Sequence, residues 1–229
     1  WKMPSLEQAL TAHNVPNLQD VLSICVDVAQ NTSTLGNLSV EEAAVLACYT
    51  FDFGQGTPDY ESNPYKLINT TLVNRGMLQL QKSRGLIHLM LFSLRKLPRF
   101  IPPQGFLYRG ITRRVNLDQQ HYFSGNKVTW HGFSSTTPSL EVTQAFLAQE
   151  AKQKGTPIDG TLFIISGPAL WGYDITPFSC IPAEQEILLE PEIDLLIKGV
   201  LAGNPITVQL EMLPSPLLLS KMIPAPSTH

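Results

Sequence analysis

The chain has 229 residues, of which 43% are hydrophobic, and its 16 basic and 19 acidic side chains give a formal net charge of −3. This composition is that of one medium-sized soluble domain, and it excludes a collagen, a disordered tail and a disulfide-rich toxin scaffold. The charges are too evenly balanced for a surface that binds nucleic acid or anionic membrane. The longest apolar stretch, from Leu86 to Leu97, is too short and too polar to span a bilayer.

The cysteines favour a reducing compartment. Cys25, Cys48 and Cys180 are odd in number, far apart and without Cys-x-x-Cys spacing, so we expect free thiols packed as small hydrophobic residues. Several Asn-x-Ser/Thr sequences fit the glycosylation pattern, however, and leave open both a cytosol-like compartment and secretion as an effector. The chain begins at Trp1 with neither an initiator Met nor a charged-then-apolar leader. We therefore expect a mature fragment or a shortened piece of a longer protein.

Residues 1–103 predict a helical lobe. Two serines each stand three residues before a Gln or Glu, the capping-box spacing in which two side chains satisfy backbone N–H groups at a helix start. The pairs are Ser5 with Gln8 and Ser39 with Glu42. Behind the second pair, Val45, Leu46 and Tyr49 predict a one-sided apolar stripe. The apolar spacing from Met77 to Leu94 predicts a helix buried on more than one side.

Residues 104–213 predict a β-rich part with one helix. Short runs of β-branched and aromatic residues predict strands at 106–111, 127–133, 161–165, 186–190 and 206–210. Thr137 as N-cap and Pro138 as first helical residue predict the start of the helix. The order predicts an α+β fold of mainly antiparallel strands, and a Rossmann sheet is not expected because Gly-x-Gly-x-x-Gly is absent. The prolines of residues 214–229 predict a Pro-rich tail.

Three segments of the β-rich part carry residues suited to chemistry. Arg109 ends an aromatic-flanked strand before Gly110, where it either binds a phosphate or carboxylate or simply points outward. The hydroxyl cluster Ser134–Thr137 is either part of a site or a turn. Alternation along a strand would place Glu184 and Glu186 on one face. There they are either a solvated edge pair or two carboxylates that flank a cation or a reacting centre.

Together these segments resemble the arginine–serine–glutamate class of mono-ADP-ribosyltransferases, the family of clostridial binary toxins and vertebrate ecto-enzymes. The matching segments are Leu-Tyr-Arg-Gly at 107–110, Gly-Phe-Ser-Ser-Thr-Thr at 132–137, and 174–189, in which a Phe-Ser loop leads into Glu-x-Glu. Tyr49-Thr50 resembles the family's helical approach to the nucleotide site, and the resemblance extends to residue 213. It implies two packed antiparallel sheets around a cleft for NAD, which would be the co-substrate, with the helical lobe alongside.

The resemblance also implies roles for individual residues in binding NAD. Arg109 would hold the diphosphate or the adjacent ribose, Gly110 would offer its backbone to the nicotinamide amide, and Ser135 would hold Glu186 in place. The other cofactor-binding residues would be Tyr65, Asn69, Thr136, Thr137 and Phe146.

Glu186 and Glu184 would carry the reaction that the resemblance implies. Cleaving the nicotinamide–ribose bond builds oxocarbenium character on the ribose, which a fixed carboxylate at Glu186 would stabilise. Glu184 would orient a guanidinium and help to remove its proton, so the acceptor would be an arginine of a target protein. The alternatives are NAD glycohydrolase activity, transfer to another acceptor, and a non-enzymatic interaction module. The histidines and cysteines lack metal-ligand spacing, so no metal site is expected.

Overall fold

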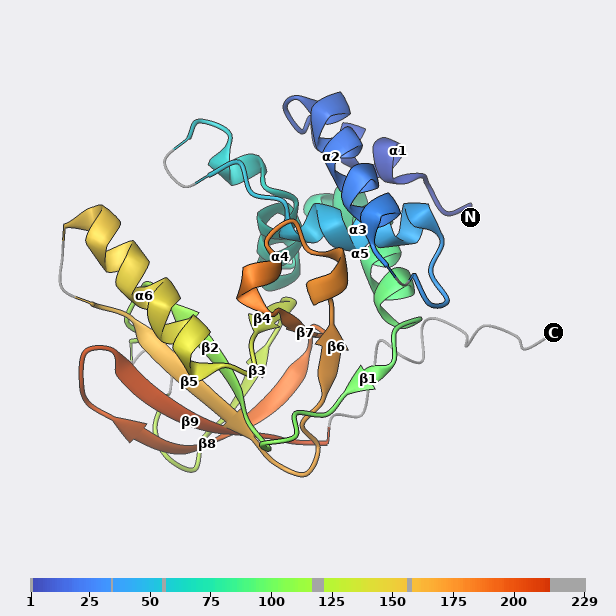
Figure 1. The fold of residues 1–229 in the computed structure, drawn as a ribbon. Coiled ribbons are helices and arrows are strands. Elements are labelled where there is room, and N and C mark those ends of the chain that lie inside the picture. Colours follow the sequence, from blue (N-terminus) through green and yellow to red (C-terminus); the bar gives the residue numbers. More distant parts are fainter. Residues whose placement is uncertain (1, 34, 55–56, 117–121, 156–157, 215–229) are drawn as a thin grey trace.

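The computed structural model describes residues 2–33, 35–54, 57–116, 122–155 and 158–214, and it shows a lobe of helices packed against two β-sheets (Figure 1). The helices of the lobe are α1 (Leu6–Thr11), α2 (Leu18–Asn31), α3 (Val40–Thr50), the short 3₁₀ helix η1 (Tyr60–Ser62), α4 (Pro64–Asn74) and α5 (Met77–Leu94). Apart from Pro214, the predicted Pro-rich tail lies outside the described residues.

Helix α3 forms the centre of the lobe. Its predicted capping box is present, with Ser39 and Glu42 each accepting from the other's backbone N–H, and α1 begins in the same way. The predicted one-sided stripe is wrong, because residues 43–50 are all buried. Alanines at three of these positions let α2, α4 and α5 pack closely around the helix. Helix α5 has the predicted bounds, and its buried residues lie from Ser83 onward.

The β-rich part consists of two sheets. The small sheet has the strand order β1 (Arg99–Phe100), β6 (Gly172–Asp174), β7 (Ile187–Leu189) and β4 (Ser134–Thr136), all antiparallel. The large sheet has the order β2 (Leu107–Ile111), β5 (Thr161–Ser166), β9 (Ile206–Met212), β8 (Ile193–Leu201) and β3 (Lys127–Trp130). Its strands β5 and β9 run parallel and its other pairs antiparallel. The predicted α+β fold with two sheets and a helical lobe is confirmed.

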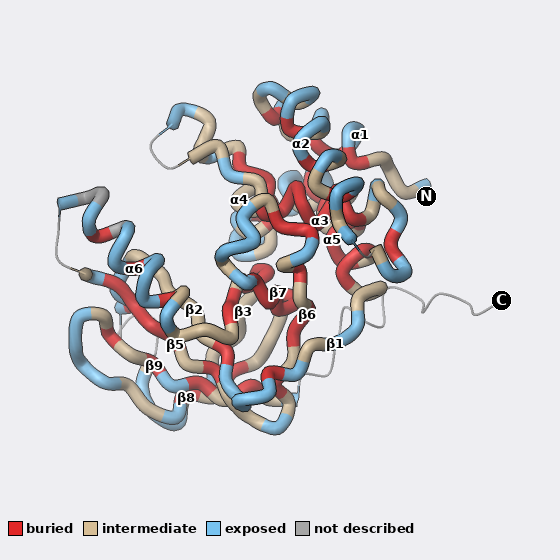
Figure 2. The backbone as a smooth tube through the Cα atoms, viewed as in Figure 1, coloured by how far each residue is buried: buried red, intermediate tan, exposed pale blue. Residues whose placement is uncertain are grey.

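Strand β7 lies between two hydrophobic cores. Leu188 packs into the core of the helical lobe, together with Tyr173 of β6 and Phe133, which directly precedes β4. Its neighbours Ile187 and Leu189 point the other way, into the core formed with the large sheet. Figure 2 shows buried residues along β7 and along α3. The strand is therefore covered on both faces, which fixes the chain on either side of it.

Two predicted element boundaries are wrong. The run 127–133 does not form one strand: β3 ends at Trp130, and Ser134–Thr136 forms a strand of its own, β4, paired with β7. Helix α6 (Leu140–Lys154) begins two residues later than predicted, with Ser139 as N-cap accepting from the N–H of Val142. Thr137 is not free to cap the helix, because its backbone exchanges two hydrogen bonds of 2.8 Å with Tyr108 of β2.

Cys25, Cys48 and Cys180 are free thiols; Cys25 and Cys48 are buried, and Cys180 is half-buried. Within the described ranges, no helix combines the length and the apolar character that a membrane crossing requires.

A buried ion pair joins the helical lobe to the small sheet. Arg95, directly after α5, donates from Nε and Nη2 to the two carboxylate oxygens of Glu190, over 3.0 and 2.9 Å. Glu190 directly follows β7, is 4% exposed, and also accepts a hydrogen bond of 3.0 Å from the Tyr173 hydroxyl. Such a bidentate, fully bonded pair fixes the end of α5 against β6 and β7.

We expect Glu190→Gln to lower the free energy of unfolding by about 2–3 kcal/mol, because it leaves the Arg95 guanidinium without a counter-ion. The loss stays below that of a fully enclosed pair because the Arg95 side chain is 20% exposed. Urea unfolding checks this value. The control is Glu61→Gln, which removes a pair to Lys66 in which the Glu61 side chain is 82% exposed, and it should cost less than about 1 kcal/mol. Equal losses in the two variants would contradict the assigned role of Arg95 and Glu190.

Candidate functional site

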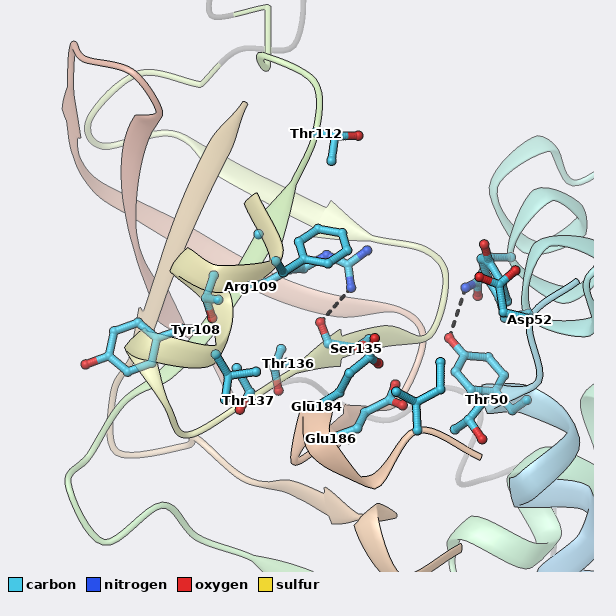
Figure 3. A pocket seen from close by; sticks show the side chains of 18 of the residues that line it. Thr50, Asp52, Tyr108, Arg109, Thr112, Ser135, Thr136, Thr137, Glu184 and Glu186 are labelled. Carbon is cyan, nitrogen blue, oxygen red and sulfur yellow. Dashed lines mark hydrogen bonds between the residues drawn. The ribbon is translucent and has the colours of Figure 1, made fainter. Parts of the chain in front are cut away.

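A cavity of about 310 Å³ lies where the helical lobe meets β2, β4 and α6 (Figure 3). The site residues predicted from the sequence all line it. They are Tyr65, Asn69, Arg109, Gly110, Ser135, Thr136, Thr137, Phe146, Glu184 and Glu186. They come from α4, β2, β4, α6 and the segment before β7, so the fold brings together residues that are up to 121 positions apart in the sequence, as from Tyr65 to Glu186.

Arg109 points into this cavity from β2. Its Nη1 donates a hydrogen bond of 2.7 Å to the backbone carbonyl of Ser135, and its guanidinium lies 5.8 Å from the centroid of the Trp130 ring. Burial lowers the pKa of Arg109, while the nearby Tyr49 hydroxyl and Glu186 carboxylate raise it. An arginine side chain nonetheless stays charged in proteins, so the cavity holds a fixed cation suited to a phosphate or carboxylate.

Strand β4 connects the arginine to the glutamates. It pairs with β7 so that Ser135 lies opposite Leu188, and the Thr136 hydroxyl donates a hydrogen bond of 2.6 Å to the carbonyl of Ile187. The Ser135 side chain also acts on the Glu186 carboxyl group, whose pKa it lowers. Ser135 therefore contacts Arg109 through its backbone and Glu186 through its side chain, and the cluster is a strand of the site rather than a turn.

The predicted strand placement of the two glutamates is wrong. Glu184 ends a 3₁₀ helix, η3 (Pro182–Glu184), and β7 begins only at Ile187. Between the glutamates, Gln185 has a φ of 48°, a left-handed conformation that turns the chain. Both side chains nevertheless line the cavity, Glu184 half-buried and Glu186 only 4% exposed.

Burial determines the acidity of both carboxyl groups. It raises the pKa of Glu186 to about 7, and the negative charge of Glu184 adds to this rise, whereas Ser135 and Arg109 oppose it. The pKa of Glu184 is also raised, first by burial and then by the negative charge of Asp52. Near neutral pH the deeper carboxyl group is thus close to its midpoint, as in sites that work by acid–base or electrostatic chemistry.

The segment before β7 is held in place by the helical lobe. It contains η2 (Thr176–Phe178) and η3. The Thr32 hydroxyl, at the end of α2, donates to the carbonyl of Pro177 over 2.8 Å. The Thr50 hydroxyl, at the end of α3, accepts from the N–H of Cys180 over 2.8 Å. The position of Glu184 is therefore set by helices that lie more than a hundred residues earlier in the chain.

Asn69 and Tyr49 form a hydrogen-bonded pair on the lobe side of the cavity. Asn69 Nδ2 donates to the Tyr49 hydroxyl over 3.0 Å, while Asn69 Oδ1 is buried without a hydrogen-bond partner. Tyr49 in turn meets Tyr65 edge-on at 6.4 Å between ring centroids. A Cβ at Gly132 would lie 2.9 Å from Asn69 Oδ1, so a larger residue at position 132 would displace the Asn69 side chain.

Gly110 and Phe146 form the α6 side of the cavity. A Cβ at Gly110 would lie 3.1 Å from side-chain atoms of Leu147 and Thr143 and 3.3 Å from Phe146, so the absence of a side chain lets α6 approach β2. Phe146 is 41% exposed and presents an aromatic ring at the cavity's border.

Several lining residues were not found by sequence reasoning. They are Asp52, Tyr60, Tyr108, Thr112, Val142 and Thr143. Asp52 and Tyr60 flank the Gly- and Pro-containing loop after α3, where no periodic pattern marks a position as inward-facing. Thr143 lies on α6 facing Gly110, and a correct helix start would have been the signal for it.

The lining offers one guanidinium, hydroxyl groups, aromatic rings and carboxylates. In the described part of the chain, no three metal-ligating side chains gather at one place. This set suits a substrate with an anionic part near Arg109 and a centre near Glu186 that becomes positively charged during reaction.

No protein-family model matches the chain, and no curated protein matches its sequence. Solved structures do match. The ADP-ribosyltransferase Vis, a toxin from Vibrio splendidus, has in its complex with agmatine a TM-score of 0.55 at 19% identity over 90% of this chain and 92% of that chain. The ADP-ribosyltransferase HopU1 of Pseudomonas syringae pv. tomato DC3000 has a TM-score of 0.56 at 21% sequence identity, over 77% of this chain and 78% of that chain. The eukaryotic mono-ADP-ribosyltransferase ART2.2 has a TM-score of 0.58 at 18% sequence identity, over 91% of this chain and 85% of that chain. The chain therefore has the ADP-ribosyltransferase fold.

We expect the buried Glu186 carboxylate to make the protein less stable as the pH rises. The pKa is about 7 in the fold and about 4.3 in the unfolded chain, so the folded state binds more protons between these values and stability falls through this window. Glu186→Gln removes this dependence. Its free energy of unfolding relative to wild type should increase by about 2–3 kcal/mol from pH 4 to pH 8, measured by urea unfolding. A difference that stays constant over this range would contradict the destabilising burial.

Proposed function

We propose that the chain transfers ADP-ribose from NAD to arginine side chains of a target protein and releases nicotinamide. The observation that carries this proposal is the convergence of Arg109, Ser135 and Glu186 in one cavity, with Glu184 also in its wall, within an ADP-ribosyltransferase fold. These residues fit the arginine–serine–glutamate class. Residues 1–103 and 104–213 together form one catalytic unit, because residues from both parts line the cavity.

NAD fits the chemistry of the lining. The fixed cation of Arg109 matches the diphosphate or the adjacent ribose, and Asn69 forms part of the cavity wall on the lobe side. Gly110 would offer its backbone to the nicotinamide amide, and the Phe146 ring a surface for nicotinamide. Tyr65 and the hydroxyl groups of the β4 segment complete the binding surface. The cavity is small for a whole dinucleotide, so it suits the nicotinamide–ribose end.

Glu186 would promote cleavage of the bond between nicotinamide and ribose. As this bond breaks, its electron pair leaves with nicotinamide and positive charge develops on the ribose. A carboxylate that is buried, and held by Ser135, stabilises that charge more strongly than one in water. Only the ionised form can do so, and its pKa of about 7 makes this form available near neutral pH.

Glu184 would position the acceptor. A carboxylate can bind a guanidinium through two parallel hydrogen bonds, and burial raises the pKa of Glu184, which makes it a better base for the proton that the attacking nitrogen loses. The new bond joins that nitrogen to the ribose carbon that nicotinamide leaves. The structure of Vis with agmatine, a small guanidinium compound, supports an acceptor of this class. Water in place of the guanidinium would make the protein an NAD glycohydrolase.

We expect agmatine to accelerate nicotinamide release from NAD by the wild-type protein. Glu186→Gln should lower release by at least about 100-fold with and without agmatine, because the developing charge loses its carboxylate. Glu184→Gln should keep the release that water supports and lose the acceleration by agmatine. The measurements are nicotinamide release and the formation of ADP-ribosyl-agmatine, with the exposed Glu61→Gln as control.

The outcomes separate the alternatives. Release of nicotinamide that agmatine leaves unchanged would replace arginine transfer with glycohydrolase activity or with another acceptor. No release by the wild type would contradict the enzymatic proposal and favour an interaction module.

A further inference from the structure

Asp52 belongs to the helical lobe but lies in the wall of the candidate active site. It follows α3 by two residues and lines the same cavity as Glu184 and Glu186. Figure 3 shows it on the helical side, across the cavity from Arg109, with Glu184 between them in this view. Asp52 is exposed, so it stands at the opening of the cavity rather than in its depth.

The Asp52 carboxylate is held in a fixed orientation. Its Oδ1 accepts hydrogen bonds of 2.6 Å from the Asn63 side-chain amide and 3.0 Å from the N–H of Gly54. Asn63 is fully buried and is itself fixed, since its Oδ1 accepts from the N–H of Phe53 over 2.8 Å. Neither bond to the carboxylate uses Oδ2. One oxygen of Asp52 thus anchors the side chain, and the other is available to a ligand.

The two carboxylates lack a cation between them. No described lysine or arginine forms an ion pair with Asp52 or Glu184, and Lys66 of the same lobe is paired with Glu61 at 2.7 Å. The negative charge of Asp52 reaches Glu184, because it contributes to the raised pKa of that group. A positively charged ligand would relieve this repulsion. A guanidinium has donors on more than one edge of its plane, so it can serve two carboxylates at once, whereas an ammonium is a compact point charge.

We propose that Asp52 and Glu184 together form the binding site for the acceptor guanidinium, with Asp52 as a specificity-determining residue supplied by the helical lobe. The proposal rests on the proposed function, which assigns Glu184 to the acceptor. It adds a second carboxylate on the opposite side of the acceptor and gives the helical lobe a direct part in choosing it.

The test is the variant Asp52→Asn, in which Oδ1 still accepts from Asn63 and Gly54 but the charge is gone. Isothermal titration should show agmatine binding about three- to tenfold more weakly than to wild type, the range of one partly exposed charge-assisted contact. The affinity for cadaverine, a diamine that carries ammonium groups instead of a guanidinium, should fall less than the affinity for agmatine. In activity assays the KM for agmatine should rise by the same factor, and by more than the KM for NAD. Asp59→Asn is the matched control, because it removes the same charge from the same segment at a residue outside the cavity.

Three results would overturn the assignment of Asp52. These are unchanged agmatine binding in Asp52→Asn, an equal loss in Asp59→Asn, or a KM for NAD that rises as much as that for agmatine. Absence of agmatine binding to wild type would overturn it as well. Failure of the proposed function has a different signature: agmatine binds and Asp52→Asn weakens it, but no ADP-ribosyl-agmatine forms.

Discussion

The architecture around the cavity depends on keeping one carboxyl group, that of Glu186, out of water. A carboxylate that is 4% exposed is costly unless hydrogen bonds and an opposite charge offset the loss of solvation. The Ser135 side chain favours the ionised form of Glu186, and the Ser135 carbonyl holds the guanidinium of Arg109 in the same cavity. Both contacts require β4 to lie between β2 and β7. The pairing of β4 with β7 and the backbone bridge between Tyr108 and Thr137 provide that placement.

The two walls of the cavity have different origins. The sheets supply Arg109 and Ser135 on a hydrogen-bonded framework, and Glu186 directly precedes β7. The helical lobe supplies Asp52 and holds the segment that carries Glu184 through Thr32 and Thr50. In the proposed reaction the sheet wall serves cleavage of the nicotinamide–ribose bond, and the lobe wall serves the acceptor. The sheets and the helical lobe thus have separate parts in the proposed reaction.

Patterns in the sequence predicted those features that depend on interactions between residues close together in the chain. The capping box of Ser39 and Glu42 and the bounds of α5 could be predicted because their interactions span a few residues. The family resemblance led to residues that line one cavity, but it did not predict their backbone conformation. Ser134–Thr136 forms a strand only because β7, about fifty residues later, pairs with it. The turn at Gln185 and the inward position of Asp52 likewise depend on distant parts of the chain, which no periodicity encodes.

The bonds that Thr32 and Thr50 make to the segment before β7 also constrain the order of folding. They join residues 145 and 130 positions apart, whereas the helical lobe is built largely from contacts between helices adjacent in sequence. Contacts between distant residues close late, because they must first overcome the entropy of the intervening loop. We therefore expect the lobe to form before these two bonds, so that Glu184 takes its place only once the lobe and the segment before β7 have met. Incompletely folded chains consequently lack a finished cavity.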